Sequence, residues 1–291
     1  MRPPVIVSLT LALVALAAMA AEESGSSVPV SAQTSADGTN TPSSTGEPLG
    51  RPLGFVWIKP GKFLMGSPPI EKERGKNEGP QTQVTITRGF WIGRHEVTQA
   101  EYQLVMGGDR SQFKGTNLPM ESVSWFNATN YCRRLSLRMQ AAKQLPSGYW
   151  FRLPTEAEWE YACRAGKIGA FAFGSSLSST KANFNGKYPY GGSPVGPNLD
   201  MTAPVGSYPA NPWGLYDMHG NVWEWCGDLY GPYPGGEVTD PKGSTNGVKR
   251  VIRGGNWFLM GRYCRSADRM YDFPGSKNES LGFRVVLAPV E

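Results

Sequence analysis

Cysteine and histidine limit the chemistry of this chain because there are so few of them. The 291 residues include four cysteines and two histidines. His95 and His219 are too few for a three-histidine iron site, and Gln99 stands where a zinc-protease helix beginning His95-Glu96 needs its second histidine. The sequence has no Gly-x-Ser-x-Gly nucleophile elbow and no glycine-rich phosphate loop.

The first fifty residues are typical of an exported protein. An apolar stretch, Val5 to Ala18, follows Arg2 and ends in small residues. This pattern predicts a signal peptide over residues 1–21, because the apolar core is too short to span a bilayer comfortably; an uncleaved anchor is the alternative. Residues 22–50 are rich in Ser, Thr, Pro and Gly and are predicted to be a disordered linker. We expect a secreted or periplasmic protein with no membrane span after cleavage.

Residues 51–291 are predicted to form one domain, since no second linker interrupts them. With 36 Gly, 24 Pro and 9 Trp in the chain, the composition favours a loop-rich fold held by aromatic packing. The net charge of +5 is small and the basic residues are scattered, which argues against binding to nucleic acid. We expect a monomer.

Short helices and strands must position the polar residues. Thr98 and Glu101 have the spacing of a capping box, and so do Thr155 and Glu158. Ser124 precedes a third segment with apolar residues at helical spacing. The helices are predicted to run from Thr98 to Met106, onward from Ser124, and from Thr155 to a stop at Gly166. Strands are predicted at residues 54–58, 63–65, 84–86 and 282–287, with mostly irregular chain between Gly166 and the last strand.

Six segments of the domain carry a family pattern. They are Trp57-Ile58-x-Pro60-Gly61-x-Phe63-x-Met65-Gly66-Ser67, Glu96-Val97-Thr98, Arg152-Leu153-Pro154-Thr155-Glu156-Ala157-Glu158-Trp159-Glu160-Tyr161, Gly214-Leu215-Tyr216-Asp217-Met218-x-Gly220-Asn221-Val222-Trp223-Glu224-Trp225, Arg253-Gly254-Gly255 and Gly282-Phe283-Arg284. In this order they resemble the formylglycine-generating enzyme family, also called sulfatase-modifying factors. The resemblance implies an α+β, loop-rich C-type-lectin-like fold with low regular secondary structure. It also implies oxidation of a sulfatase cysteine to formylglycine, with oxygen, copper(I) held by two thiolates, and structural calcium.

The resemblance implies a calcium site on one loop of this chain. Its ligands map to the side chains of Asp217 and Glu224 and to the carbonyls of Gly220 and Val222. Carboxylates and carbonyls on a tight loop suit a hard cation. The alternative is that these acids only cap a turn.

A second calcium site implied by the resemblance is less complete. It maps to Asn183 and the carbonyl of Phe184, with partners near Asn198 and Asp200. The spacing departs there from the family pattern.

The copper pair implied by the resemblance is incomplete. Its two positions map to Leu259 and Cys264, and leucine offers no donor to a soft cation. Met260 is expected to be a buried packing residue. Because Cys264 is the single cysteine after Gly255, no local pair can form, and copper is not expected.

Disulfides are expected in an exported chain with an even number of cysteines. The resemblance pairs Cys163 with the region of Cys264, and leaves Cys132 without its family partner. Cys226 is a second possible partner of Cys264. A free, reactive Cys264, as a remaining catalytic thiolate, is the third interpretation.

The resemblance also locates a substrate groove. Trp223, Asn256, Trp257, Arg262 and Arg269 map to it, and core packing or loop hydrogen bonding is the alternative for each. The leading hypothesis is an exported family member whose oxidase activity is doubtful because of Leu259. The competing hypothesis is a non-catalytic lectin-like module that binds a peptide, a glycan or a partner protein.

Overall fold

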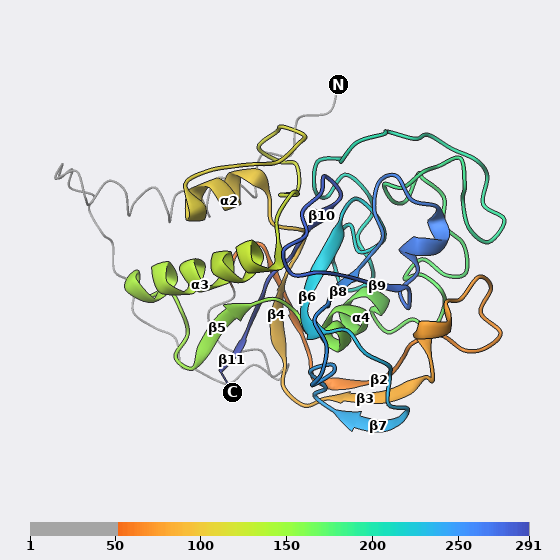
Figure 1. Cartoon of the computed structure of the whole chain (residues 1–291), viewed down its shortest axis with the longest axis horizontal. Coiled ribbons are helices and arrows are strands. Elements are labelled where there is room, and N and C mark those ends of the chain that lie inside the picture. The colour runs from red at the N-terminus through yellow and green to blue at the C-terminus, as the bar shows by residue number, and fades with distance from the viewer. Residues whose placement is uncertain (1–51, 291) are drawn as a thin grey trace, which may run out of the picture.

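The computed structural model describes residues 52–290, and the predicted signal peptide and linker lie outside this range. Figure 1 shows short helices and strands joined by long loops. The strands are β1 (Phe55–Ile58), β2 (Gly61–Met65), β3 (Thr82–Ile86), β4 (Phe90–Gly93), β5 (Tyr149–Arg152), β6 (Trp223–Leu229), β7 (Gly236–Thr239), β8 (Arg250–Arg253), β9 (Arg269–Asp272), β10 (Leu281–Gly282) and β11 (Val286–Pro289). The helices are α2 (Gln99–Met106), α3 (Trp125–Ala141) and α4 (Glu156–Arg164), with 3-10 turns η1 (Lys76–Glu78) and η2 (Gly261–Cys264).

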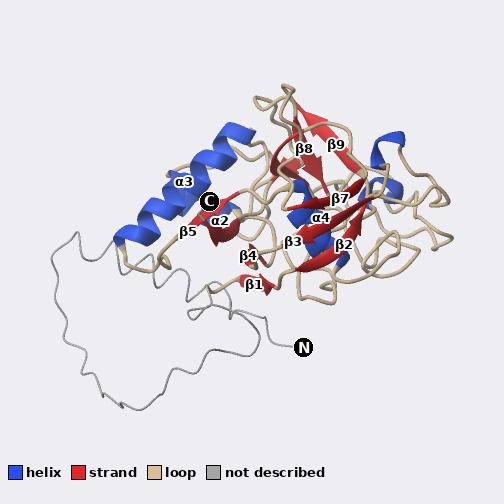
Figure 2. Cartoon of the chain, turned by 90° about the horizontal axis from the view of Figure 1, so that it is seen from below, coloured by secondary structure: helices blue, strands red, loops and turns tan. Residues whose placement is uncertain are grey.

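These strands form three small sheets. Their strand orders are β1-β4-β11-β5, β10-β6-β8-β9 and β2-β3-β7. Most neighbours are antiparallel, while β10 with β6 and β3 with β7 are parallel. Helix α4 packs against β2, β6 and β8 and so joins two sheets, whereas α2 and α3 pack together beside β5 (Figures 1 and 2). The predicted α+β, loop-rich architecture is confirmed.

The three predicted helices begin where their caps predict. The Thr98, Ser124 and Thr155 hydroxyls each accept a hydrogen bond from the backbone N–H three residues on. In α2 and α4 the third-position glutamate completes the capping box, and in α3 Asn127 does so. These hydrogen bonds join residues only three positions apart. The capping residues were therefore sufficient to predict where the helices begin.

The predicted strand at residues 282–287 was wrong in its extent. It is split into β10, which pairs with β6, and β11, which pairs with β4 and β5. Between them Arg284 turns inward to form an ion pair with Glu224, so the chain leaves one sheet and enters another.

The chain after Gly166 is also more regular than predicted. Residues 165–222 have no helix or strand in the structure, as expected, and form the green to teal loops at the upper right of Figure 1. Strands β6 to β9 then follow, and none of these four was predicted from the sequence. Within residues 52–290 no helix is long and apolar enough to cross a membrane.

Loops 165–190 have a small apolar core of their own. Phe171, Leu177, Phe184 and Tyr190 are buried there together with Cys264. This cluster fixes the loop that carries Asn183 and Phe184 of the second predicted calcium segment, since burial of aromatic side chains compensates for the lack of backbone ladders.

Candidate functional site

The predicted calcium loop carries an acidic side chain in an unusual backbone conformation. Asp217 has φ +58° and is 7% exposed. Its Oδ2 accepts a hydrogen bond from the Gly206 N–H at 2.7 Å. Burial raises the pKa of Asp217 to about 6. The carboxylate therefore lies in the interior, where water does not stabilise its charge.

Glu224, the other predicted acidic ligand, is held by protein groups. Arg284 donates to both of its oxygens, Nε to Oε2 at 2.6 Å and Nη2 to Oε1 at 2.7 Å. The Trp159 indole N–H donates to Oε2 at 2.7 Å. All three side chains are fully buried. The observed role of Glu224 is thus structural: its carboxylate holds the Arg284 guanidinium in place.

Glu96 is a third buried carboxylate beside this loop, and no role was predicted for it from the sequence. Its Oε1 accepts from the Asn221 Nδ2 at 3.0 Å, while its Oε2 is buried without a hydrogen-bond partner. Burial, followed by the charge of Asp217, raises the pKa of Glu96 well above its usual value. Glu96 lies in one of the six segments that carry the family pattern, which could have marked it as a site residue. Its partner Asn221, however, lies 125 residues away in sequence.

The charge balance of this loop favours a cation. Glu96, Asp217 and Glu224 influence one another, and Arg284 is the cation that compensates them. An unpartnered buried carboxylate oxygen is costly unless it is protonated or coordinates a metal. Across residues 52–290 no three His, Cys, Asp or Glu side chains group closely enough to hold a metal by themselves. Main-chain carbonyls, such as those expected from Gly220 and Val222, would have to complete the ligand set.

The second predicted calcium segment is occupied by protein contacts. The Asn183 Nδ2 donates to the Met201 carbonyl and to the Asn221 Oδ1, and the Asn183 carbonyl accepts from the Asn221 N–H. Asn198 instead donates to Asp200 at 2.6 Å. Phe184 is part of the loop core. Asn183 therefore acts as a link between loops.

The residues at the copper positions do not fit copper(I). Leu259 packs against the apolar core, and its carbonyl accepts from the Asn185 N–H at 2.8 Å. Cys264 is completely buried, and a Cβ on Gly255 would lie 2.6 Å from its Sγ. Burial raises the pKa of the Cys264 thiol far above its usual range. Met260 is 40% exposed, so its predicted burial was wrong.

The cysteines differ from the expected disulfides. All four lie within residues 52–290, and each is a free, buried thiol. Cys163 lies 3.6 Å from the Ser266 hydroxyl and 3.9 Å from either ring nitrogen of His219. The structure thus forms neither the Cys163–Cys264 nor the Cys226–Cys264 bond, and Cys132 is buried in a separate cluster from Cys163 and Cys264.

His219 does not activate the neighbouring thiol. Its Nε2 accepts from the Ala172 N–H at 3.1 Å, so its Nδ1 carries the proton donated to the Cys264 carbonyl at 2.8 Å. Burial lowers the pKa of His219 to about 4, and burial raises that of Cys163 to about 12. A neutral, fully bonded imidazole beside a protonated thiol is a structural arrangement.

Three of the five predicted groove residues lie in the interior. Trp223 is 6% exposed. Asn256 is fully buried, and its Oδ1 caps a turn by accepting from the N–H groups of Phe258 and Leu259. Arg269 is 2% exposed and donates to both oxygens of Glu156 at 2.7 and 2.6 Å. Trp223 thus packs in the core, Asn256 caps a turn, and Arg269 forms a buried ion pair.

The other two predicted groove residues lie near the surface. The half-buried Trp257 donates to the Glu279 carbonyl and makes an edge contact with Phe113, 5.6 Å between ring centroids. The half-buried Arg262 lies over the ring of Tyr263, 4.5 Å from its centroid. These two side chains are more exposed than those of Trp223, Asn256 and Arg269.

Comparison with known proteins agrees with the fold. The chain matches the sulfatase-modifying factor enzyme 1-like domain over residues 42–289. It is 40% identical over 188 residues to the formylglycine-generating enzyme of Streptomyces coelicolor, covering 61% of this chain and 55% of that protein. The chain thus spans about half the length of that relative.

Two solved structures are similar along nearly their whole length. Treponema denticola variable protein 1 has a TM-score of 0.67 and 26% identity, covering 81% of this chain and 95% of that one. PvdO from Pseudomonas aeruginosa has a TM-score of 0.64 and 30% identity, covering 81% and 94%.

Proposed function

Since this chain belongs to the family of sulfatase-modifying factor enzyme 1-like domains, we propose that it is an exported member that acts by binding and not by copper-dependent oxidation of cysteine. The residues at the copper positions carry this proposal. Leu259 has no donor side chain, and Cys264 is a single, fully buried thiol whose pKa is raised by burial. The family's copper(I) ion is held by a pair of thiolates, and this segment has no second thiol to pair with Cys264.

Calcium is part of the proposal. Asp217, with Glu96 beside it, would hold the ion together with carbonyls of the 217–224 loop. Bound calcium would supply positive charge to a buried acidic cluster and so stabilise the loop. Asn221 would orient Glu96, since its Nδ2 already donates to the Glu96 Oε1.

A peptide assay tests the absence of oxidase activity. The purified chain is incubated with copper(I), oxygen and a Cys-x-Pro-x-Arg peptide, and the peptide is analysed by mass spectrometry, with an active formylglycine-generating enzyme as positive control. We expect no aldehyde. Turnover in this assay would refute the proposal.

Copper binding gives a second, independent measurement. A competition titration with a copper(I) chelator is expected to give the same result for the wild type and for Cys264→Ser. A loss of copper binding in Cys264→Ser would show that this thiol is a ligand after all.

A further inference from the structure

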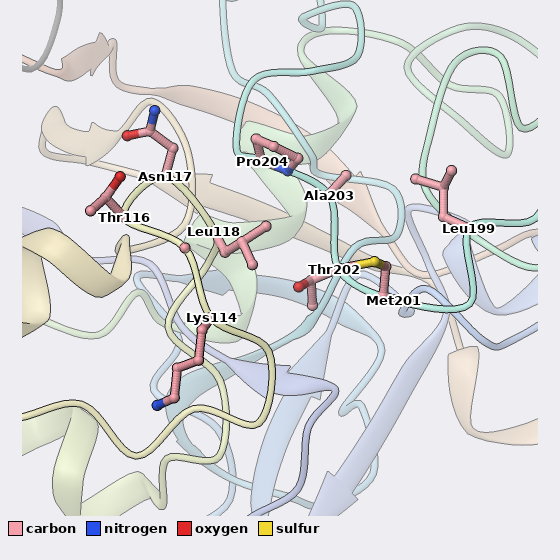
Figure 3. Close-up of a pocket in the computed structure, with 10 residues that line it drawn as sticks. Lys114, Thr116, Asn117, Leu118, Leu199, Met201, Thr202, Ala203 and Pro204 are labelled. Carbon is pink, nitrogen blue, oxygen red and sulfur yellow. The ribbon is translucent and has the colours of Figure 1, made fainter.

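A cavity of about 460 Å³ lies between two loops that are distant in sequence. Figure 3 shows its lining residues, which belong to segments 114–118 and 199–204. A hydrogen bond from the Val205 N–H to the Asn117 carbonyl, 2.9 Å long, joins the two loops beside it. Its volume is within the usual range for small-molecule sites.

The floor of the cavity is a fixed structure. The Ala203 N–H donates to the Asn221 Oδ1 at 2.9 Å, and the Met201 carbonyl accepts from the Asn183 Nδ2 at 3.0 Å. Both asparagines are at most 2% exposed. The site is therefore held in shape before any ligand arrives, which reduces the ordering cost of binding.

One polar group of the lining has no partner. Thr202 is 2% exposed, and its Oγ1 makes no hydrogen bond within residues 52–290. In Figure 3 this oxygen points toward the side chain of Leu118 across the cavity. Buried hydroxyls are normally hydrogen-bonded, so a ligand atom is the natural partner for this one.

The remaining lining favours an uncharged, apolar ligand. Leu118, Leu199, Met201, Ala203 and Pro204 contribute mostly carbon. Lys114 is the charged residue of the lining, and its Nζ already pairs with the Asp109 Oδ2 at 3.0 Å. An anionic ligand would have to compete with Asp109 for this amine.

We propose that this cavity binds a neutral, largely apolar small molecule with one polar group that hydrogen-bonds to the Thr202 hydroxyl. The site is separate from the copper positions and from the carboxylates of the 217–224 loop. Loss of this binding would leave the proposed absence of oxidase activity untouched, so the two proposals fail independently.

Two fluorescent dyes with one skeleton provide the test. N-phenyl-1-naphthylamine is neutral with one N–H donor, and 8-anilino-1-naphthalenesulfonate adds a negative charge. The full chain is titrated with each. We expect saturable binding of the neutral dye, at least tenfold tighter than the sulfonate. No binding of the neutral dye, or equal or tighter binding of the sulfonate, would overturn the proposal.

Variants locate the binding. Leu199 lines the cavity and is 47% exposed, and Leu199→Trp should lower the affinity for the neutral dye at least tenfold. The matched control is Leu64→Trp, at a 45% exposed leucine on β2, which should leave the affinity for the neutral dye unchanged. Met201→Trp is the second blocking variant, should Leu199→Trp fold poorly by circular dichroism. Unchanged affinity in a folded blocking variant would place the dye elsewhere and refute the site.

Thr202→Val tests the polar contact. It keeps the shape of the side chain and removes the hydroxyl. One hydrogen bond corresponds to a loss of about 2- to 12-fold in affinity. Because the hydroxyl is unpartnered in the free protein, the melting temperature should not fall. Unchanged dye affinity in Thr202→Val would refute the role of this hydroxyl.

Discussion

Arg284 and Glu224 form a two-point ion pair in the interior of the domain, with N–O distances of 2.6 and 2.7 Å and no exposure of either side chain. Arg284 also donates to the carbonyls of Gly93 and Tyr216. One guanidinium thus ties β6 to the point where the chain passes from β10 to β11.

Removing one partner of this pair should be strongly destabilising. In Arg284→Met, Glu224 and its acidic neighbours lose their buried cation, and we expect a loss of about 3–5 kcal/mol in the free energy of unfolding. Urea denaturation measures it. The double variant Arg284→Met/Glu224→Met should recover part of the loss. Arg152→Met breaks a more exposed pair with Glu158 and should lower the free energy of unfolding by less. An equal loss in the two variants would show that burial does not strengthen the effect.

Calcium should raise the thermal stability of the wild type. Ligand binding to the native state at 100 times the dissociation constant contributes about 2.7 kcal/mol. We expect EGTA to lower the melting temperature of the wild type, with little effect on Asp217→Asn or Glu96→Gln. Glu237→Gln, an exposed acid on β7, is the control and should respond as the wild type does. Equal responses of all four proteins would argue against calcium at this loop.

Asp228 should make stability depend on pH. Burial, followed by the charge of Glu156, raises the pKa of Asp228 to about 8, whereas an unfolded aspartate titrates near 3.9. The folded state therefore retains a proton that the unfolded state releases. The stabilisation is complete below about pH 4 and is lost as the pH rises through 8.

The measurement is urea denaturation at pH 5 and pH 8. Asp228→Asn should lose less stability between these pH values than the wild type, because its amide does not titrate. The amide oxygen can still accept from the Glu156 N–H, which donates to Asp228 at 2.8 Å. Identical losses in the two proteins would show that Asp228 is ionised in the native state.

The four cysteines should be inert in the native protein and reactive when it unfolds. Burial raises the pKa of every one, that of Cys163 to about 12. Titration with a disulfide reagent, without reductant, should find no accessible thiol in the native state and four in guanidinium. Two thiols in guanidinium would instead support the disulfide expected from the sequence.

The helices and their caps were predictable because their signals are local. Thr155 and Glu158 are three residues apart, and the box they form needs no other part of the chain. The family motifs likewise predicted the fold class, because they lie in a fixed order along the domain.

Strands β6 to β9 and the environment of each site residue were not predictable. Strand β7 pairs in parallel with β3, more than 150 residues earlier, and no local pattern specifies that partner. Residue type also does not decide burial: Arg269 is buried against Glu156, while Met260 is exposed. Glu96 was missed because its partner Asn221 is remote in sequence.

The position of β11 has a consequence for biosynthesis. Although it is the last described strand, it lies between β4 and β5 and pairs with both. That sheet cannot be completed until residues 286–289 have left the ribosome or the translocation channel. Because these pairings join distant parts of the chain, we expect folding to be slow, with the facing edges of β4 and β5 open until β11 pairs with them.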